Sequence, residues 1–268
     1  MAIHPTALID STAVIDASAH IGPYAVIGPE VQIAAGVDLG PHAVVLSHTR
    51  IGKGCRIHAH AVVGDAPQDV AFSGEPSWVD IGEGVVIREG VTIHRGTKPD
   101  SATRVGDGCF LMANSHLAHN VELGRRVIVA NGALLAGYVV VGDGAFISGN
   151  AAIHQFCRVG RLAMIAGSSA ISRDVPPFCT TYAGAYNEVV GLNTVGLRRA
   201  GFSPEDRLHV KRAFALYYRQ GLRPAEAVAR IRAEWPTGPA RAFADFAADS
   251  KRGLCALSRR PRAVEESD

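Results

Sequence analysis

The sequence is poor in aromatic side chains and contains no long apolar run. Only 6% of its 268 residues are Phe, Trp or Tyr, whereas 47% are hydrophobic and 29 residues are glycine. An interior with few rings must be filled by small aliphatic side chains in thin, regular layers. No run of about 18 apolar residues occurs, which predicts that no helix spans a membrane. The N-terminus lacks the basic and apolar regions of a secretory signal.

Cysteine is also scarce. The chain has five cysteines, an odd number, and their spacing is typical of neither a disulfide framework nor a zinc site. We therefore expect a reducing, cytoplasmic compartment.

The charged residues are unevenly distributed along the chain. Before Leu197 there are 12 Lys and Arg against 16 Asp and Glu, and after it there are 15 against 9. A basic C-terminal part favours an anionic partner. We expect no nucleic-acid partner.

An aliphatic residue recurs at every sixth position. The series covers 3–63, 81–93 and 105–171 in one phase, and all 26 positions are Ile, Leu or Val. The position four residues later is usually small, as in Ala7 and Ala13. One hexamer cannot bury its apolar face alone, so the units must stack. Three hexamers per coil place residues 18 apart above one another, at about 4.8 Å per coil. The pattern predicts a parallel β-helix over residues 3–171.

The same phase assigns roles to other small residues. A glycine often follows the aliphatic residue, and we expect it to adopt the tight corner conformation there: Gly52, Gly82, Gly106 and Gly142. Three cysteines occupy the small inward position and are expected to be packing residues: Cys55, Cys109 and Cys157.

Two segments interrupt the repeat without changing its phase. They are residues 64–80 and 94–104. Insertions in a solenoid form surface loops, often on the binding face, so both are candidate walls of a substrate site. The β-helix should end at 172–177, because paired prolines cannot pair a strand on both edges.

A second, helical domain is expected over 192–268, after a β-helix domain at 1–191. Ser203 is a candidate N-cap, with Pro204 and two acidic residues in the first turn. This helix should run to about Gln220 and stop at Gly221. Two further helices are predicted near 224–235 and 239–250, and 259–268 should be a frayed tail.

Ten of the eleven histidines lie in the β-helix region. None occupies an inward position, so their side chains should lie outside or at corners. His94, His116, His119 and His154 fall near the second insertion and the later coils, and such a cluster indicates a functional site. A lone exposed histidine is more often only solvated. The spacing of His116 and His119 would also suit zinc, although a carboxylate ligand near them is less obvious, because Asn120 follows His119.

Several ordered strings resemble a known family. They are Gln68-Asp69, Gly74-Glu75-Pro76, His94-Arg95-Gly96-Thr97, Leu111 to His119, Ile153 to Cys157, Asp174 to Pro177, Gly196 to Phe202 and Arg252-Gly253-Leu254. Together they are similar to the UDP-N-acetylglucosamine 3-O-acyltransferases of lipid A, and hence lipopolysaccharide, biosynthesis. The hexapeptide repeat alone would be weak, because many acyltransferases share it, but the ordered set covers nearly the whole chain.

The resemblance implies a left-handed β-helix in a cytoplasmic homotrimer, with active sites between adjacent subunits. It implies that an acyl group passes from the thioester of acyl carrier protein to the 3-hydroxyl of the sugar. No metal or other cofactor takes part in that family.

The resemblance also implies roles for individual residues. His119 matches the general base, and histidine suits that task because its pKa lies near working pH. Gly137 matches the residue whose backbone N–H faces the oxyanion. Gly167 matches the position that limits acyl length, where a glycine leaves room for a medium to long 3-hydroxyacyl chain. Sugar and nucleotide contacts match Gln68, Asp69, His94, His116, His154, Gln155, Asn193 and Arg199. Basic residues that could attract acidic carrier protein are Arg198, Arg199, Lys211, Arg212, Arg219 and Arg223.

The chain departs from the family pattern at five positions. Ala71, Asn120, Tyr138, Val195 and Ala200 stand where the family usually has Lys, Asp, His, Glu and Arg. Losing a lysine and an arginine should weaken attraction for a diphosphate. Three alternatives therefore stay open: acylation of another nucleotide sugar, such as the 3-amino analogue; binding without turnover; and a metal-dependent hydratase on the same β-helix.

Overall fold

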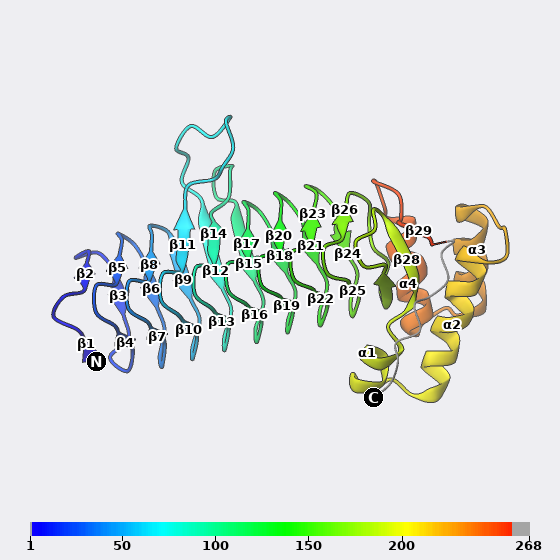
Figure 1. Ribbon diagram of the computed structural model, residues 1–268, viewed down its shortest axis with the longest axis horizontal. Helices are drawn as coiled ribbons and strands as arrows, with labels where there is room; N and C mark the ends of the chain where they lie inside the picture. Colours follow the sequence, from blue (N-terminus) through cyan, green and yellow to red (C-terminus); the bar gives the residue numbers. More distant parts are fainter. Residues whose placement is uncertain (1, 259–268) are drawn as a thin grey trace.

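The computed structural model describes residues 2–258. The chain coils into a long left-handed prism whose three sides are β-sheets, here sheets A, B and C, which are parallel except for the antiparallel pair β27–β28 at the end of sheet A. The N-terminus lies at one end of the prism, and a group of helices lies at the other (Figure 1). The predicted 259–268 tail lies outside the described residues.

Each coil contributes one short strand to each sheet in the order A, B, C. Sheet A contains β1 (Ala2–Ile3), β4 (His20–Ile21), β7 (Asp38–Leu39), β10 (Arg56–Ile57), β13 (Val86–Ile87), β16 (Phe110–Leu111), β19 (Ile128–Val129), β22 (Phe146–Ile147), β25 (Met164–Ile165), β27 (Cys179–Thr181), β28 (Glu188–Leu192) and β29 (Ala256–Leu257). Sheet B contains β2 (Leu8–Ile9), β5 (Val26–Ile27), β8 (Val44–Val45), β11 (Val62–Asp65), β14 (Thr92–His94), β17 (His116–Leu117), β20 (Leu134–Leu135), β23 (Ala152–Ile153) and β26 (Ala170–Ile171). Sheet C contains β3 (Val14–Ile15), β6 (Gln32–Ile33), β9 (Thr49–Ile51), β12 (Trp78–Ile81), β15 (Ala102–Val105), β18 (Glu122–Leu123), β21 (Val140–Val141) and β24 (Arg158–Val159).

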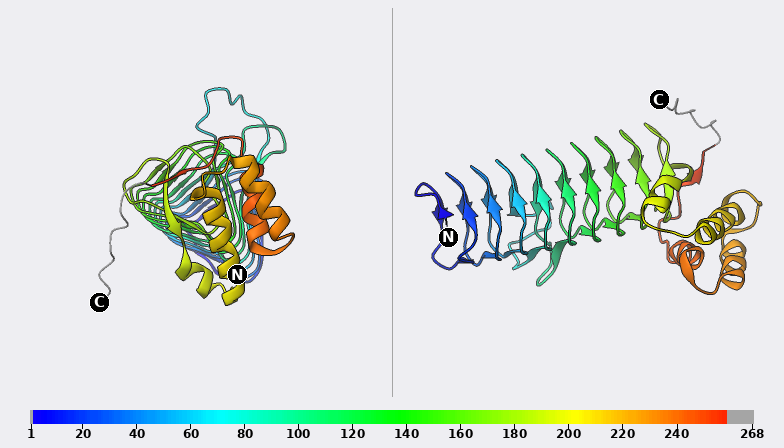
Figure 2. Two further views of the ribbon diagram at one scale, coloured as in Figure 1. Left: turned by 90° about the vertical axis from the view of Figure 1, so that its right-hand side faces the viewer. Right: turned by 90° about the horizontal axis from the view of Figure 1, so that it is seen from below.

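The register confirms the predicted 18-residue coil. Leu117 pairs with Leu135, which in turn pairs with Ile153. Similar residue types therefore lie above one another in successive coils. The regular ladder ends at Ile171, as expected. Figure 2 shows the stacked coils both along the prism and from below.

The interior is a column of the aliphatic residues that define the repeat. From Ile21 onward these side chains are buried, and the small inward residues are buried with them. Cys55, Cys109 and Cys157 are fully or almost fully buried, as a packing role requires. Burial raises the pKa of the Cys109 and Cys157 thiols to about 11, so both stay neutral.

The corner glycines have a different role from the one predicted. The left-handed residue is the third after the aliphatic, for example Gly54 with φ +65 and Asn120 with φ +59. Gly52 does not have a positive φ. A Cβ at Gly52 would lie 2.6 Å from the backbone carbon of Gly82 on the next coil. These glycines are therefore required by close stacking of coils, and our conformational reason was wrong.

The C-terminal region is helical, as predicted, and contains one helix more. The helices are α1 (Thr194–Arg199), α2 (Pro204–Tyr218), α3 (Pro224–Glu234) and α4 (Gly238–Ala248). The Ser203 hydroxyl accepts a hydrogen bond from the Asp206 N–H at 3.0 Å, which confirms the predicted cap of α2. Helix α1 was not predicted because six residues give too little periodicity to detect.

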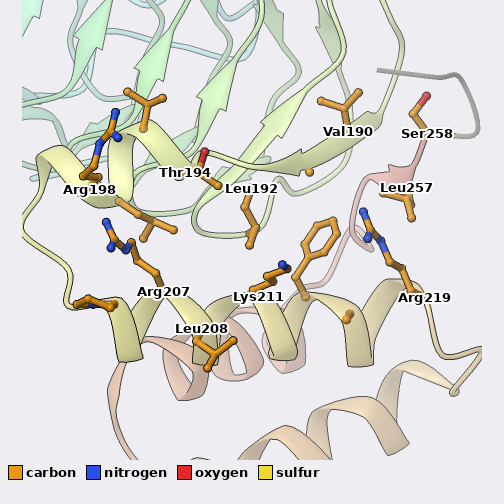
Figure 3. Close-up of a pocket in the computed structure, with 16 residues that line it drawn as sticks. Val190, Leu192, Thr194, Arg198, Arg207, Leu208, Lys211, Arg219, Leu257 and Ser258 are labelled. Atoms are coloured by element: carbon orange, nitrogen blue, oxygen red, sulfur yellow. The ribbon is translucent and has the colours of Figure 1, made fainter. Parts of the chain in front are cut away.

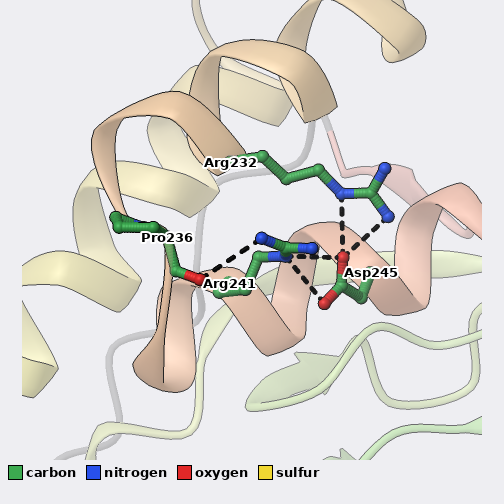
Figure 4. Close-up of polar contacts among 4 residues, drawn as sticks. All are labelled: Arg232, Pro236, Arg241 and Asp245. Carbon is green, nitrogen blue, oxygen red and sulfur yellow. Dashed lines mark hydrogen bonds and ion pairs between the residues drawn. The ribbon is translucent and has the colours of Figure 1, made fainter.

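The helical region is joined to the β-helix at several points. Strand β29 returns to pair with β28, and Ser250 donates a hydrogen bond to the buried Asp174 at 2.8 Å. Between α3 and α4, Asp245 holds both Arg232 and Arg241, and the Arg241 hydrogen bond is the main reason that the pKa of Asp245 is lowered (Figure 4). The division into domains at residues 191 and 192 stays a prediction. Within residues 2–258, no helix combines the length and apolar character needed to cross a bilayer.

Candidate active site

Both inserted loops leave the prism at the same edge. Loop 66–77 connects β11 to β12, and loop 95–101 connects β14 to β15, so both lie where sheet B turns into sheet C (Figure 1). We name this the B–C edge, and the other two edges A–B and C–A. The loops are shorter than the interruptions in the sequence because their flanking strands are lengthened. Arg95 lies over the Phe72 ring at 5.4 Å, so the two loops touch.

His119 and Gly137 stack on this edge, one coil apart. The His119 side chain lies at a corner, as predicted, and is only 9% exposed. A Cβ added at Gly137 would lie 2.6 Å from His119 Nε2. The imidazole therefore rests directly on the Gly137 backbone, and only glycine leaves room for it. Within the described residues, the Gly137 N–H donates no hydrogen bond.

Asn120 lies beside the His119 ring. Its Oδ1 atom lies 3.2 Å from His119 Nδ1 and also accepts the Thr97 N–H at 3.1 Å. Because an amide oxygen only accepts, Nδ1 must carry the proton. The Nε2 lone pair of the neutral ring is then free, facing Gly137, and can accept a proton from a bound group.

Thr97 connects the second loop to this edge. Its hydroxyl lies 2.9 Å from Asn120 Oδ1 and 2.8 Å from the Tyr138 hydroxyl. The Tyr138 ring meets the His119 ring edge-on at 5.3 Å and stacks on Phe156 at 4.9 Å. Tyr138 and Phe156 thus form an aromatic wall beside His119.

His94 and His116 form a second pair of rings on sheet B. Their ring centroids lie 4.9 Å apart, and His116 Nδ1 is bonded to the Thr92 hydroxyl at 2.7 Å. Burial lowers the pKa of both rings, that of His116 to about 4, so both are neutral at pH 7. His94 is buried where β14 ends at the B–C edge, and its Nδ1 atom has no hydrogen-bond partner among the described residues.

His154 and Gln155 lie farther along the same edge and are exposed. Gln155 stands 18 residues after Gly137 and therefore one coil above it. The Arg252 guanidinium lies 3.4 Å from His154 Nδ1 and donates to the Ser172 carbonyl at 3.0 Å. The segment after α4 thus reaches back to the B–C edge.

Gln68 and Asp69 lie in the first loop. Gln68 is exposed, and Asp69 Oδ1 accepts the Ala71 N–H at 3.0 Å, which shapes the loop. Neither residue contacts His119 in any described hydrogen bond or ion pair. One chain therefore brings together His94, His116, His119 and Gly137, with the first loop above them.

The remaining predicted residues lie on other edges of the same chain. Asn193 donates to the Leu162 carbonyl at 2.9 Å and caps α1, which places it at the C–A edge with the exposed Arg199. Gly167 follows β25 and lies on the A–B edge. A Cβ at Gly167 would come no closer than 3.5 Å to Gly149 O. No single edge of one chain holds all the predicted residues.

A separate pocket of about 960 Å³ lies between β28, α1 and α2. Its floor is apolar and includes Leu197 and Phe214, and four cationic side chains surround it (Figure 3): Arg198, Arg207, Lys211 and Arg219. Within residues 2–258, none of these four forms an ion pair. Three of them were predicted to attract a carrier protein, and Arg207 was missed because it sits close to Glu205 and Asp206 in the sequence.

The described residues contain no group of three or more His, Cys, Asp or Glu side chains that could hold a metal ion. The three-residue spacing of His116 and His119 therefore gathers no ligand set within one chain. Thr97, Phe156 and Arg252 are the contacts that sequence reasoning missed. All three lie in strings that carry the family resemblance, but their contacts with Asn120, Tyr138 and His154 require the fold.

Three family descriptions match the chain. Residues 174–255 match "Udp N-acetylglucosamine O-acyltransferase; Domain 2", residues 102–137 match "Bacterial transferase hexapeptide (six repeats)", and residues 3–97 match "GMPPB C-terminal domain". A curated acyl-[acyl-carrier-protein]–UDP-N-acetylglucosamine O-acyltransferase of Janthinobacterium sp. (strain Marseille) is 44% identical over 258 residues. That match covers 94% of this chain and 98% of the relative.

Solved structures agree over similar lengths. The UDP-N-acetylglucosamine acyltransferase of Francisella novicida is 37% identical, with a TM-score of 0.91, covering 96% of this chain and 95% of its own. The enzyme of Bacteroides fragilis is 38% identical, with a TM-score of 0.89, covering 94% and 99%. By these matches and its site, the chain belongs to the family of acyl-[acyl-carrier-protein]–UDP-N-acetylglucosamine O-acyltransferases.

Proposed function

We propose that this chain transfers a 3-hydroxyacyl group from acyl carrier protein to the 3-hydroxyl of UDP-N-acetylglucosamine, the first step of lipid A biosynthesis. The observation that carries this proposal is the His119 imidazole, held against the Gly137 backbone with its Nε2 lone pair free. The names of the relatives supply the donor and acceptor classes.

His119 acts as the general base. Its Nε2 atom takes the proton of the sugar hydroxyl while that oxygen attacks the thioester carbonyl carbon. The carbonyl oxygen becomes an oxyanion, which the free Gly137 N–H is placed to stabilise. Collapse of the tetrahedral intermediate re-forms the carbonyl and breaks the carbon–sulfur bond. The carrier thiolate leaves and receives the proton from His119.

The acceptor lies along the B–C edge beneath the two loops. Gln68, Asp69, His94, His116, His154 and Gln155 contact the sugar and nucleotide. Neutral His94 and His116 suit this role, because uncharged rings can donate and accept hydrogen bonds with sugar hydroxyls. The reaction requires no metal or other cofactor.

The working enzyme is a homotrimer. Asn193 and Arg199 at the C–A edge, and Gly167 at the A–B edge, complete the site when edges of neighbouring subunits meet. The outward faces of sheets A and B support such an assembly, because they carry apolar side chains: Leu8, Val26, Val44 and Leu134 on B, and Phe110, Ile128, Phe146 and Met164 on A. Gly167 leaves space for the end of a medium to long acyl chain.

Acyl carrier protein docks on the basic pocket of the helical region. Carrier proteins of this kind are acidic, and the pocket presents Arg198, Lys211 and Arg219 around an apolar floor. The other predicted cations, Arg199, Arg212 and Arg223, are exposed nearby and would add to the long-range attraction. Because its donor is a cytoplasmic carrier, we place the enzyme in the cytoplasm.

Product formation tests the proposal. Purified protein is incubated with a panel of 3-hydroxyacyl carrier proteins and either UDP-N-acetylglucosamine or its 3-amino analogue, and products are identified by mass spectrometry. We expect the O-acylated sugar from wild type and a drop of about 10²–10⁴-fold in His119→Ala. His60→Ala, an exposed corner histidine on the A–B edge, serves as the control.

The other outcomes are informative. Preference for the 3-amino analogue would show that the acceptor is a different nucleotide sugar. Binding of the nucleotide sugar without product would show that the chain binds it without catalysing acyl transfer. Activity that disappears with a chelator and returns with zinc would favour the hydratase alternative.

A further inference from the structure

Asn120 and Tyr138 depart from the family pattern, and the structure joins them. The Thr97 hydroxyl lies within hydrogen-bond distance of both side chains. A hydroxyl has one proton, and the acceptor-only Asn120 Oδ1 takes it. The Tyr138 hydroxyl must therefore donate to Thr97 Oγ. The chain of donors runs from Tyr138 through Thr97 to Asn120 and ends on the oxygen that faces His119.

Asn120 is itself held firmly. Its backbone N–H donates to the buried Thr103 hydroxyl at 2.7 Å, and its φ of +59 is a conformation that asparagine tolerates. Its Oδ1 atom receives the Thr97 N–H, the Thr97 hydroxyl and the His119 Nδ1–H. Three donors converge on one neutral oxygen in a site that is largely closed to water.

We propose that Asn120, held by Thr97 and Tyr138, is the positioning residue that fixes His119 in the Nδ1–H tautomer. The role is performed without a carboxylate: a neutral oxygen orients the ring and adds no charge that would favour the imidazolium. Tyr138 and Thr97 supply through hydrogen bonds the rigidity that an ionic contact would otherwise provide. The inference rests on the proposed function only for its kinetic part.

The surroundings of His119 contain few other titratable groups. Tyr138 lies on the next coil, and His94 lies on the sheet B side, with Asp65 and His116 beyond it. No Lys or Arg is bonded to His119 in the described residues. A carboxylate introduced at position 120 would therefore be the nearest charge to the ring.

Tautomer measurement tests the positioning role independently of activity. Two-bond ¹H–¹⁵N spectra of the full-length protein, labelled at histidine, distinguish a protonated Nδ1 from a protonated Nε2. We expect His119 to be the Nδ1–H form in wild type and to lose that preference in Asn120→Gly. Glycine keeps the left-handed backbone and removes only the side chain. Asn114→Gly, a left-handed corner residue on the A–B edge with φ +58, is the matched control.

Kinetics test the consequence. Asn120→Gly should lower kcat about 30-fold with KM changed less than about threefold, as expected when only orientation of a general base is lost. Thr97→Val and Tyr138→Phe should lower kcat less, in that order, because each removes a more distant link. Asn120→Asp should keep the tautomer but move the acidic limb of the kcat/KM profile to higher pH, because a carboxylate favours the protonated ring.

Each contrary result has a separate meaning. An Nε2–H tautomer in wild type, or an unchanged tautomer in Asn120→Gly, overturns the positioning role whatever the enzyme does. An unchanged acidic limb in Asn120→Asp also contradicts it. If the Nδ1–H form is found but no acyl transfer occurs, the positioning role stands and the proposed function fails.

Discussion

Sheets B and C are built from the same coils, yet their outer faces differ in chemistry. The outward residues of sheet B are mostly apolar, whereas those of sheet C form a ladder in which Asp80 and Glu122 hold Arg50 and Arg104. The inward residues of both sheets are the same aliphatics. The repeat therefore determines the interior residues, while the outward residues can be suited to contact with either solvent or a partner. An apolar outward face thus indicates contact with another subunit, and a charged outward face indicates contact with solvent.

The largest effect is expected from Leu134→Asp on the outer face of sheet B. Leu134 is 50% exposed in one chain, and a carboxylate there would be buried against a neighbouring subunit at a prohibitive desolvation cost. We expect the proposed trimer to dissociate completely, as measured by light scattering. Val140→Asp is the matched control, since Val140 is 39% exposed on sheet C of the same coil. Equal dissociation of both variants, or a monomeric wild type, would contradict the comparison.

The next effect concerns glycines on two edges. Gly137→Ala on the B–C edge should lower kcat/KM about 100-fold, because a Cβ there displaces the His119 ring. Gly167→Ala on the A–B edge has room for its methyl group, so it should leave the rate with short acyl chains unchanged and reduce it only with longer ones. Rates with a series of acyl carrier proteins check this. A similar loss of rate in both variants for every acyl chain length would contradict the different roles assigned to the two glycines.

A smaller effect is expected from pH. The folded-state pKa of His116 is lowered to about 4 by burial and by nearby His94, from its ordinary 6.5. The unfolded chain thus binds a proton at a higher pH than the folded chain does. Stability contributed by neutral His116 is complete above about pH 6.5 and is lost as pH falls toward 4.

Calorimetry at several pH values checks this. The Tm should fall over that window, and His116→Asn should flatten the fall in part, since His94 also has a lowered pKa. His20→Asn, exposed on sheet A, is the control. A Tm independent of pH between 4 and 6.5 would contradict the predicted loss of stability at low pH.

The smallest effect is expected on sheet C. Arg104 approaches Asp80 at 3.8 Å and Glu122 at 3.6 Å. The side chains of Arg104 and Glu122 are about half exposed, and that of Asp80 is 32% exposed. Arg104→Gln should lower the free energy of unfolding by less than about 1 kcal/mol, and salt should abolish the difference. Urea titrations in low and high salt measure it. A loss of several kcal/mol would mean that this face is not simply solvated.

Much of the fold could be predicted because the β-helix repeats one local rule. The phase of Ile, Leu and Val alone fixes the interior and the positions of both loops. What the sequence could not show is which edge a residue occupies relative to others. His119, Asn193 and Gly167 each match the family pattern, but only the three-dimensional coil places them on three different edges.

The contacts around His119 were least predictable. Thr97 is 41 residues from Tyr138, and their hydroxyl contact depends on how the second loop folds over the edge. The departures at positions 120 and 138 looked independent in the sequence. Their shared partner makes them one unit, which no periodicity could have indicated.

The left-handed corners carry a consequence for engineering. Tyr138 and Phe156 both adopt positive φ, at +60 and +64, a backbone state that costs an aromatic residue roughly 1–3 kcal/mol. Glycine would relieve that cost at either position. A laboratory selection for heat resistance would therefore accept glycine at these two corners, as it would at left-handed corners of the other edges such as His42 and Arg126. The resulting proteins would unfold at higher temperatures but would lack the aromatic wall beside the His119 ring. Selection for thermal stability and selection for turnover should therefore favour different residues at positions 138 and 156.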